Sequence, residues 1–185
     1  MCEVAKIQST GASNRIEGIY TSDERLEAIV KDKSTPISRS ECEIAGYREV
    51  LSLIHENYHY MNLTVNVILQ MHRDLYHFES SGMGCQFKNS DNIIAEMDTL
   101  GKAFVRFKPV CAFETPMAME QLVIAFSEAI NKNEYDPLIL TPMFILDFFV
   151  FIRLTMEMVG LADLLHFSCF IALGILWANI SVLKK

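Results

Sequence analysis

Two side chains near the N-terminus have the types and the spacing to act together. Ser13 and Glu17 stand four residues apart in the stretch ASNRIEG, residues 12–18. On a helix such residues share one face, where a fixed carboxylate can pair with a cation. Gly18 follows directly and can end or bend the helix, because glycine readily adopts the left-handed conformation of helix ends. Taken alone, the pair is typical of a solvated helix surface.

The other residues that could bind metals or act as nucleophiles are scattered. His72 and His77 fall beside an apolar helix face, where core-edge histidines are commoner than ligands. The N-terminus lacks the apolar core of a secretory signal. The cysteines are odd in number and form no CxxC pair, which predicts neither a disulfide framework nor a zinc site and favours a reducing cytoplasm. They are Cys2, Cys42, Cys85, Cys111 and Cys169.

The elements that must position these residues are mostly helical. Thr21 with Glu24 and Ser40 with Glu43 have the spacing of capping boxes, which predicts two helix starts. Apolar residues then repeat at helical spacing in three segments. They are Ile44, Tyr47, Leu51 and Ile54; Ile68, Met71, Leu75 and Phe78; and Met119, Leu122, Val123, Phe126 and Ile130.

The segment from residue 80 onward has a different character. The runs NIIAEM and AFVRFKPV, separated by DTLGK, predict a β-hairpin with a longer loop. Thr115 is placed to cap the next helix, with Pro116 at its first position, and residues 138–149 begin a predicted buried helix. The sequence therefore predicts an all-α domain with one inserted β-hairpin.

In this order, motifs over residues 6–149 resemble those of the Fic family (Fic/DOC, or Fido), helical domains that transfer AMP from ATP to target-protein hydroxyls. SNRIEG resembles the inhibitory motif of the family, here Ser13, Glu17 and Gly18. TPMAMEQL and DPLILTPMFILDF resemble the helices that lead to the active site. CQFKNSDNII followed by VRFKPV resembles the flap hairpin that docks the target, here through Phe87, Lys88, Asn89, Ser90, Asp91 and Asn92.

The resemblance implies partners and cofactors. Family members use ATP and Mg²⁺, and they bind a target protein along the edge of the flap. Backbone groups on a hairpin edge can add an extended peptide as a further strand, with little side-chain specificity. In the inhibitory motif, Glu17 would pair with the arginine that otherwise grips the γ-phosphate, which holds ATP in a non-productive pose.

The catalytic loop of the family, His-Pro-Phe-x-Asp/Glu-Gly-Asn-Gly-Arg, should come next. Its histidine removes the target hydroxyl proton, its acid holds Mg²⁺, its glycine amides cradle phosphates and its arginine grips the γ-phosphate. Directly after Phe149, however, the chain reads VFIRLTMEMVGLAD, residues 150–163. We therefore predict no catalytic residue, no metal ligand and no productive binding of ATP and Mg²⁺ in this chain.

The genetic code relates this segment to the missing loop. In the reading frame displaced one base upstream, Met156 with Glu157 and Met158 with Val159 can only overlap as glycine codons. The overlap of Glu157 with Met158 can only encode Asn or Asp. From Phe151 to Gly160 the other overlaps permit His-Pro-Phe-Asn-Asp-Gly-Asn-Gly-Arg. The sequence therefore predicts a one-base frameshift near codon 150, in nature or in sequencing.

The predicted organisation has three parts. Residues 1–34 form an N-terminal segment with the inhibitory helix, residues 35–149 a partial Fic domain, and residues 150–185 an aberrant apolar tail, so that the C-terminal part of the fold is truncated. The predicted function is that of a protein adenylyltransferase by descent, inactive as written. The net charge of −7 argues against a nucleic-acid partner.

Two alternatives stay open. Residues 164–183 contain no charged side chain and Lys184 and Lys185 follow them, as in a tail-anchored membrane protein. Membrane association of this tail is thus the alternative to a purely cytoplasmic location. The other alternative is a non-catalytic module that binds peptides through the flap. The sequence predicts neither the target protein nor the oligomeric state.

Overall fold

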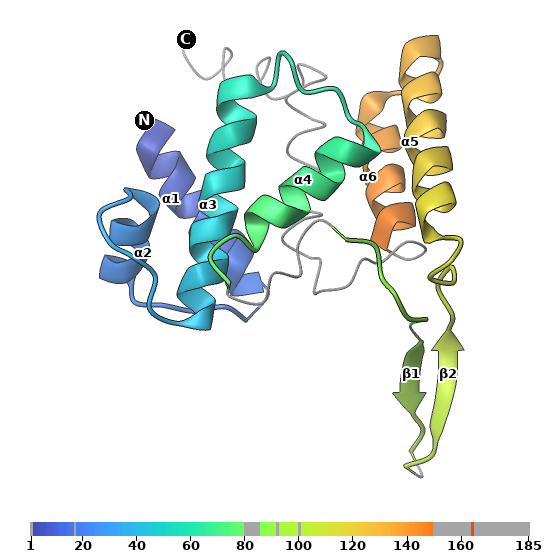
Figure 1. Ribbon diagram of the computed structural model, residues 1–185, viewed down its shortest axis with the longest axis horizontal. Coiled ribbons are helices and arrows are strands. Elements are labelled where there is room, and N and C mark those ends of the chain that lie inside the picture. Colours follow the sequence, from blue (N-terminus) through green and yellow to red (C-terminus); the bar gives the residue numbers. More distant parts are fainter. Residues whose placement is uncertain are drawn as a thin grey trace. The chain divides into compact units, whose positions relative to one another are not determined.

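The computed structural model describes residues 2–149, except 17, 80–85, 92 and 100, and also Leu164. Within these residues the fold is mostly helical with one antiparallel hairpin, as predicted (Figure 1). The elements are α1 (Cys2–Ile16), α2 (Asp23–Val30), α3 (Arg39–Asn57), α4 (Val65–Leu75), β1 (Ile94–Met97), β2 (Ala103–Phe107), α5 (Thr115–Lys132) and α6 (Pro137–Asp147).

The described chain divides into two compact units, residues up to 79 and residues 86–149. The predicted boundaries after residues 34 and 149 stay predictions.

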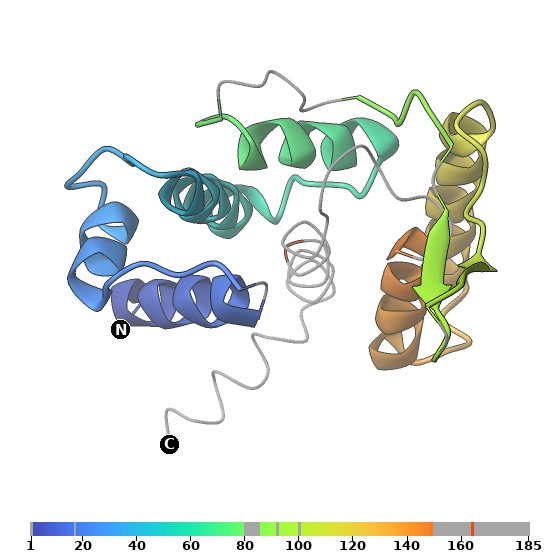
Figure 2. The same ribbon diagram turned by 90° about the horizontal axis from the view of Figure 1, so that it is seen from below.

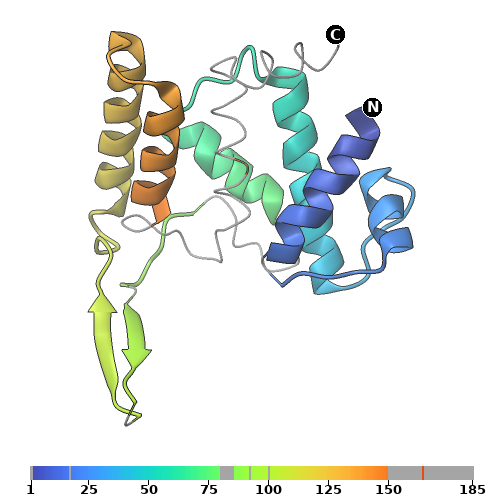
Figure 3. The ribbon, with the colours of Figure 1, turned by 180° about the vertical axis from the view of Figure 1, so that it is seen from behind.

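Helix α3 is the centre of the first unit. Helices α1, α2 and α4 all contact it, and α3 lies between α1 and α4 (Figures 2 and 3). The stripe predicted for this helix is confirmed, since its members are at most 4% exposed: Ile44, Tyr47, Leu51 and Ile54. Burial of such a stripe stabilises a helix far more than its intrinsic propensity does.

Helices α3 and α4 approach closely at Gly46. A Cβ atom at this position would lie 1.8 Å from the carbonyl oxygen of Leu75, so only glycine permits the contact. Ile68, Met71 and Leu75 of α4 are buried, as predicted. His72, expected at the edge of this face, is fully buried, and burial lowers its pKa to about 4.

The starts of α2 and α3 differ from the predicted ones. Helix α2 is capped by Ser22, whose hydroxyl accepts a hydrogen bond from the Arg25 N–H at 3.2 Å. Helix α3 is capped by Ser38, which accepts in the same way from the Glu41 N–H. The predicted caps Thr21 and Ser40 were therefore wrong. Both true caps have the extended backbone that an N-cap requires, whereas Ser40 is already helical.

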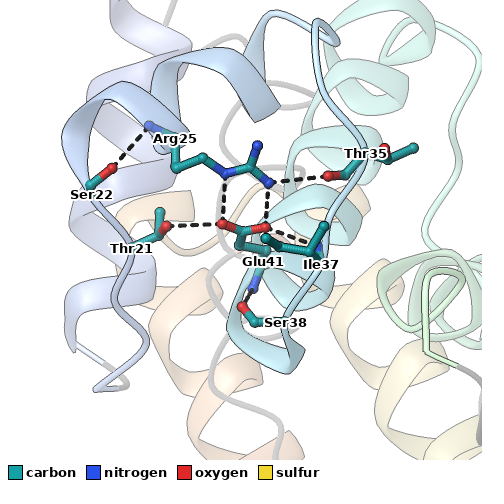
Figure 4. Close-up of polar contacts among 7 residues, drawn as sticks. All are labelled: Thr21, Ser22, Arg25, Thr35, Ile37, Ser38 and Glu41. Atoms are coloured by element: carbon teal, nitrogen blue, oxygen red, sulfur yellow. Dashed lines mark hydrogen bonds and ion pairs between the residues drawn. The ribbon is translucent and has the colours of Figure 1, made fainter.

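A buried ion pair joins the starts of α2 and α3 (Figure 4). The Glu41 carboxylate, on a side chain only 6% exposed, accepts hydrogen bonds from two Arg25 nitrogens at 2.8 and 2.5 Å. It also accepts from the Ile37 N–H at 2.9 Å and from the Thr21 hydroxyl at 3.3 Å. Arg25 donates further to the Thr35 carbonyl at 3.1 Å. The hydrogen bond from Arg25 is the main cause that lowers the pKa of Glu41 to about 2.

The second unit contains the β-hairpin followed by a pair of helices. The hairpin extends from the N-terminal end of α5 (Figures 1 and 3). Helix α5 packs on α6 through Phe126 and Phe144, whose ring centres are 4.8 Å apart. The predicted cap of α5 was wrong, because Thr115 already lies inside the helix and Glu114 occupies the cap position without a side-chain bond. The Thr115 hydroxyl instead donates to the Cys111 carbonyl at 2.8 Å.

Helix α6 is apolar on its outer face as well as on its packed face. Thr141 and Phe144 are buried. The side chains of the outer face are all more than half exposed: Leu138, Ile139, Met143 and Leu146. The expectation of a buried helix was therefore wrong for this face. No helix in the described part of the chain is long and apolar enough to cross a membrane; the proposed anchor at residues 164–183 lies outside that part, apart from Leu164.

The natural chain should lose stability in acid as Glu41 is protonated, and Glu41→Gln should remove this part of the loss. The folded carboxyl has a pKa of about 2 against an ordinary value of 4.5. The ion pair therefore stabilises the fold fully above pH 4.5, and this contribution declines as the pH falls towards 2. Glu41→Gln should be less stable than the natural chain at pH 7, and the difference should shrink below pH 4.5. Urea unfolding across pH 2–7 measures it, with Glu24→Gln on the exposed surface of α2 as the control. A constant difference would contradict the prediction.

Protonation of His72 should cause a second loss of stability, at a higher pH than that caused by protonation of Glu41. Its folded pKa of about 4 lies below the ordinary 6.5, so between these values the unfolded chain binds a proton that the folded chain does not. Stability should fall as the pH drops from 6.5 towards 4. His72→Gln should flatten this part of the pH profile in the same urea experiment. The control is His77→Gln, which replaces a histidine on the exposed surface of the same unit.

Gly46→Ala should destabilise the first unit by about 3 kcal/mol, since the added methyl group meets the Leu75 backbone, which cannot move aside as a side chain can. Gly18→Ala is the comparison. A Cβ at Gly18 would meet no atom within 4 Å and would only strain a left-handed backbone, which costs about 1 kcal/mol. Thermal unfolding of both variants should rank them in this order, and equal losses would show that the close contact at Gly46 does not govern the packing of α3 and α4.

Candidate functional site

The C-terminal end of α1 carries the predicted inhibitory motif. Gly18 has a φ of 78°, and its N–H donates to the Arg15 carbonyl at 3.1 Å. The next N–H, of Ile19, donates to the Asn14 carbonyl at 2.9 Å. These two bonds form a Schellman motif, which favours glycine in the left-handed position. The prediction that Gly18 ends the helix is confirmed.

Ser13 lies where α1 meets α3. Its hydroxyl accepts a hydrogen bond of 3.0 Å from the hydroxyl of Tyr47, whose side chain is buried. Near the other end of α1, the Lys6 ammonium donates to the Ser52 hydroxyl at 3.2 Å. Two polar contacts between the same pair of helices fix the rotation of α1 about its own axis. Glu17 lies outside the described residues, so its predicted pairing with an arginine stays a prediction.

Helix α1 also fits closely against α2. A Cβ atom on Gly11 would lie 2.8 Å from a methyl carbon of Leu26, so the glycine lets the two helices approach. Leu26 belongs to a buried cluster with Ile29, Val30, Ile44 and Ala45. The Arg25–Glu41 ion pair holds α2 to α3, and α2 in turn supports α1. The motif at the end of α1 is therefore held in place by the packing of α1 against α2 and α3.

The predicted flap is an antiparallel hairpin closed by a glycine turn, with one irregularity in its pairing. Its strands pair antiparallel, with Glu96 opposite Phe104. At the turn, the Gly101 N–H donates to the Asp98 carbonyl and the Asp98 N–H donates to the Lys102 carbonyl, both at 3.0 Å. Gly101 has a φ of 77°, in the left-handed region that favours glycine. The predicted hairpin with a longer loop is confirmed.

The predicted docking residues precede β1 and do not lie within it. Lys88 is 4% exposed, and its ammonium donates to the carbonyl of Val110. Asp91 accepts a 2.7 Å hydrogen bond from the N–H of Ala112. These bonds tie the chain entering β1 to the chain leaving β2, so the base of the hairpin is closed.

The other docking residues are placed as follows. Phe87 is half-buried, whereas Asn89 and Ser90 are exposed, and Asn92 lies outside the described residues. Their contact with a target protein stays a prediction. The structural role of Lys88 and Asp91 was not predicted, because their partners lie about twenty residues further along the chain.

Among the described residues we searched for a cluster of metal ligands and for a basic depression. These residues contain no group of three His, Cys, Asp or Glu side chains that could hold a metal ion. A depression of about 820 Å³ in the first unit is lined by side chains of both signs, Lys6 and Arg48 among Glu49, Asp32 and Asp74. Arg48 already pairs with Asp32 at 2.6 Å. This depression therefore lacks the excess positive charge that a triphosphate requires.

Comparison with solved structures identifies the fold. The chain is similar to a Fic domain containing signaling protein from Bacteroides thetaiotaomicron, with a TM-score of 0.76 and 17% identity over 91% of this chain and 63% of that one. It is also similar to a Fic family protein from Desulfovibrio desulfuricans, with a TM-score of 0.65 and 15% identity over 89% of this chain and 47% of that one. No family model and no curated protein matches the chain.

These values show a common fold, and they also show that the chain spans less than two thirds of either protein. The hairpin lies between α4 and α5, where the sequence motifs predicted it. The chain has the fold of the Fic domain proteins.

Proposed function

We propose that this chain descends from a Fic-type protein adenylyltransferase, which transfers AMP from ATP to a target hydroxyl, and that it does not itself catalyse the transfer. The fold it shares with a Fic domain protein over 91% of its length supports the descent. The sequence after Phe149 supports the loss of activity, because the loop that performs the chemistry in the family belongs there and VFIRLTMEMVG stands in its place.

Each missing group removes a separate contribution to the rate. A positioned general base contributes about 10²–10⁴-fold, and electrostatic stabilisation of the transferred phosphoryl group is usually larger still. His166 is the one histidine in the sequence beyond Phe149, and no motif around it would restore the role of a base. We therefore assign no residue of this chain to the binding of ATP or Mg²⁺.

The chain retains the segment of the inhibitory motif and the flap hairpin, although the catalytic loop is missing. The end of α1 is seated on α2 and α3, and the hairpin has a closed base and a regular turn. The function that these parts support is binding of an extended protein segment by the hairpin, without AMP transfer. A one-base frameshift near codon 150, which we propose from the overlapping codons, accounts for the presence of these parts without the loop.

Moving the reading frame of the gene one base upstream near codon 150 should restore AMP transfer. The chain as written should incorporate no label from ATP radiolabelled at the α-phosphate when incubated with a cell lysate and Mg²⁺. The moved-frame protein should label target proteins, and more strongly with Glu17→Gly, because the inhibitory carboxylate is then removed. Labelling by the chain as written would contradict the proposed loss of activity.

The control is the moved-frame protein without its motif histidine, which should return to background. Sequencing the gene gives an independent test of the frameshift. Codons 151–160 that cannot spell the His-Pro-Phe motif in the displaced frame would refute it.

A further inference from the structure

The two edges of the hairpin present different backbone groups. In an antiparallel pair, hydrogen-bonded and non-hydrogen-bonded residue pairs alternate. Asp98 is bonded to Lys102, so the next bonded pair is Glu96 with Phe104. The backbone groups of Ala95 and Met97 therefore point away from β2. The edge of β1 thus offers two N–H and two C=O groups to an added strand.

The edge of β2 carries features that prevent strand addition. The pairing skips from Val105 opposite Ala95 to Phe107 opposite Ile94, so Arg106 is an extra residue in β2. Such a bulge twists and disrupts an edge. Lys102, Arg106 and Lys108 also lie along this strand and its ends, all exposed, and lysine or arginine on an edge is a common device against pairing.

The edge of β1 has neither a bulge nor a cation. The backbone groups of Ala95 and Met97 point away from β2. Their side chains lie on the same face of the sheet as those of Ala103 and Val105, because directly paired residues point to the same side. All four are exposed, Met97 at 74% and Val105 at 57%. An added strand would therefore meet apolar side chains on this face. No described residue pairs with this edge.

The opposite face of β1 carries the carboxylate of Glu96, which lies between Ala95 and Met97. The Glu96 side chain is 47% exposed, and one of its oxygens pairs with Arg106 of β2 at 2.5 Å, so a cation on β2 balances part of its charge. A residue added directly opposite Glu96 would lie on this face, on the side away from Arg106. A lysine or arginine there complements the carboxylate, whereas an acidic residue is repelled.

We propose that the β1 edge binds an extended segment of a partner protein in which two apolar residues flank a lysine or arginine. The apolar residues lie opposite Ala95 and Met97, and the basic residue lies opposite Glu96. This proposal rests on the proposed function, binding of an extended protein segment by the hairpin, and adds to it the edge that binds and the residues that it prefers. The pattern replaces the expectation of little side-chain specificity with a definite one.

The test uses the full chain and two labelled peptides, Ser-Thr-Val-Lys-Val-Thr-Ser and the same peptide with Glu in place of Lys. Fluorescence anisotropy should show binding about threefold tighter for the lysine peptide, the scale of an exposed ion pair, and the difference should shrink at high salt. Glu96→Gln should abolish the preference and Glu96→Lys should reverse it. Equal binding of both peptides to the natural chain, or binding of neither, would overturn the proposal.

A pair of proline variants identifies the edge. Met97→Pro removes an N–H at the β1 edge and should weaken the lysine peptide about tenfold or more, whereas Val105→Pro removes the corresponding N–H at the β2 edge and should leave binding unchanged. The reverse result would assign binding to β2. Where a proline disturbs the hairpin, N-methylated peptides keep the test decisive. Methylation of the two valine amides should abolish binding, and methylation of the lysine amide should not.

These readouts separate the two proposals. Peptide binding with the stated preference, but no labelling by the moved-frame protein, refutes only the descent from an active enzyme. Labelling by the moved-frame protein without any peptide preference refutes only the specificity of the β1 edge.

Discussion

The buried carboxylate of Glu41 is the constraint on which the first unit depends. A charge removed from water is costly unless every lone pair finds a donor, and here one guanidinium, one backbone N–H and one hydroxyl supply them. The donors come from the start of α2 and from the connection between α2 and α3. The hydrogen bonds to this one carboxylate therefore fix the chain that precedes α3. Helix α1 packs on α2 and α3, the two helices that the ion pair joins.

Local signals predicted the elements but not their exact starts. The apolar stripe of α3, the glycine end of α1 and three members of the stripe of α4 were read correctly, because each depends on neighbours within a few residues. Phe78 was wrongly included, since α4 ends at Leu75 and Phe78 is half-buried in the turn that follows. The capping boxes at Thr21 and Ser40 were misplaced. Thr21 donates to Glu41, twenty residues away, so its hydroxyl serves a tertiary contact. Arg25 and Glu41 likewise carry no sequence pattern that would pair them.

For the hairpin too, local signals were read correctly and long-range contacts were missed. Turn residues and β-prone runs predicted its place, and the motifs predicted a docking role. The difference between its edges follows from the bulge at Arg106, which depends on the pairing register, and register is decided by turn geometry and packing together. The buried ammonium of Lys88 was also unpredicted, since its acceptor is a backbone carbonyl with no side-chain signature.

The outer face of α6 bears on the origin of the chain. A helix apolar all round is typical of a domain interior, yet α6 leaves Leu138, Ile139, Met143 and Leu146 mostly exposed. This composition is what selection for a larger core produces, and similar Fic proteins are indeed longer than this chain. The frameshift proposed near codon 150 lies three residues after the end of α6, which is Asp147.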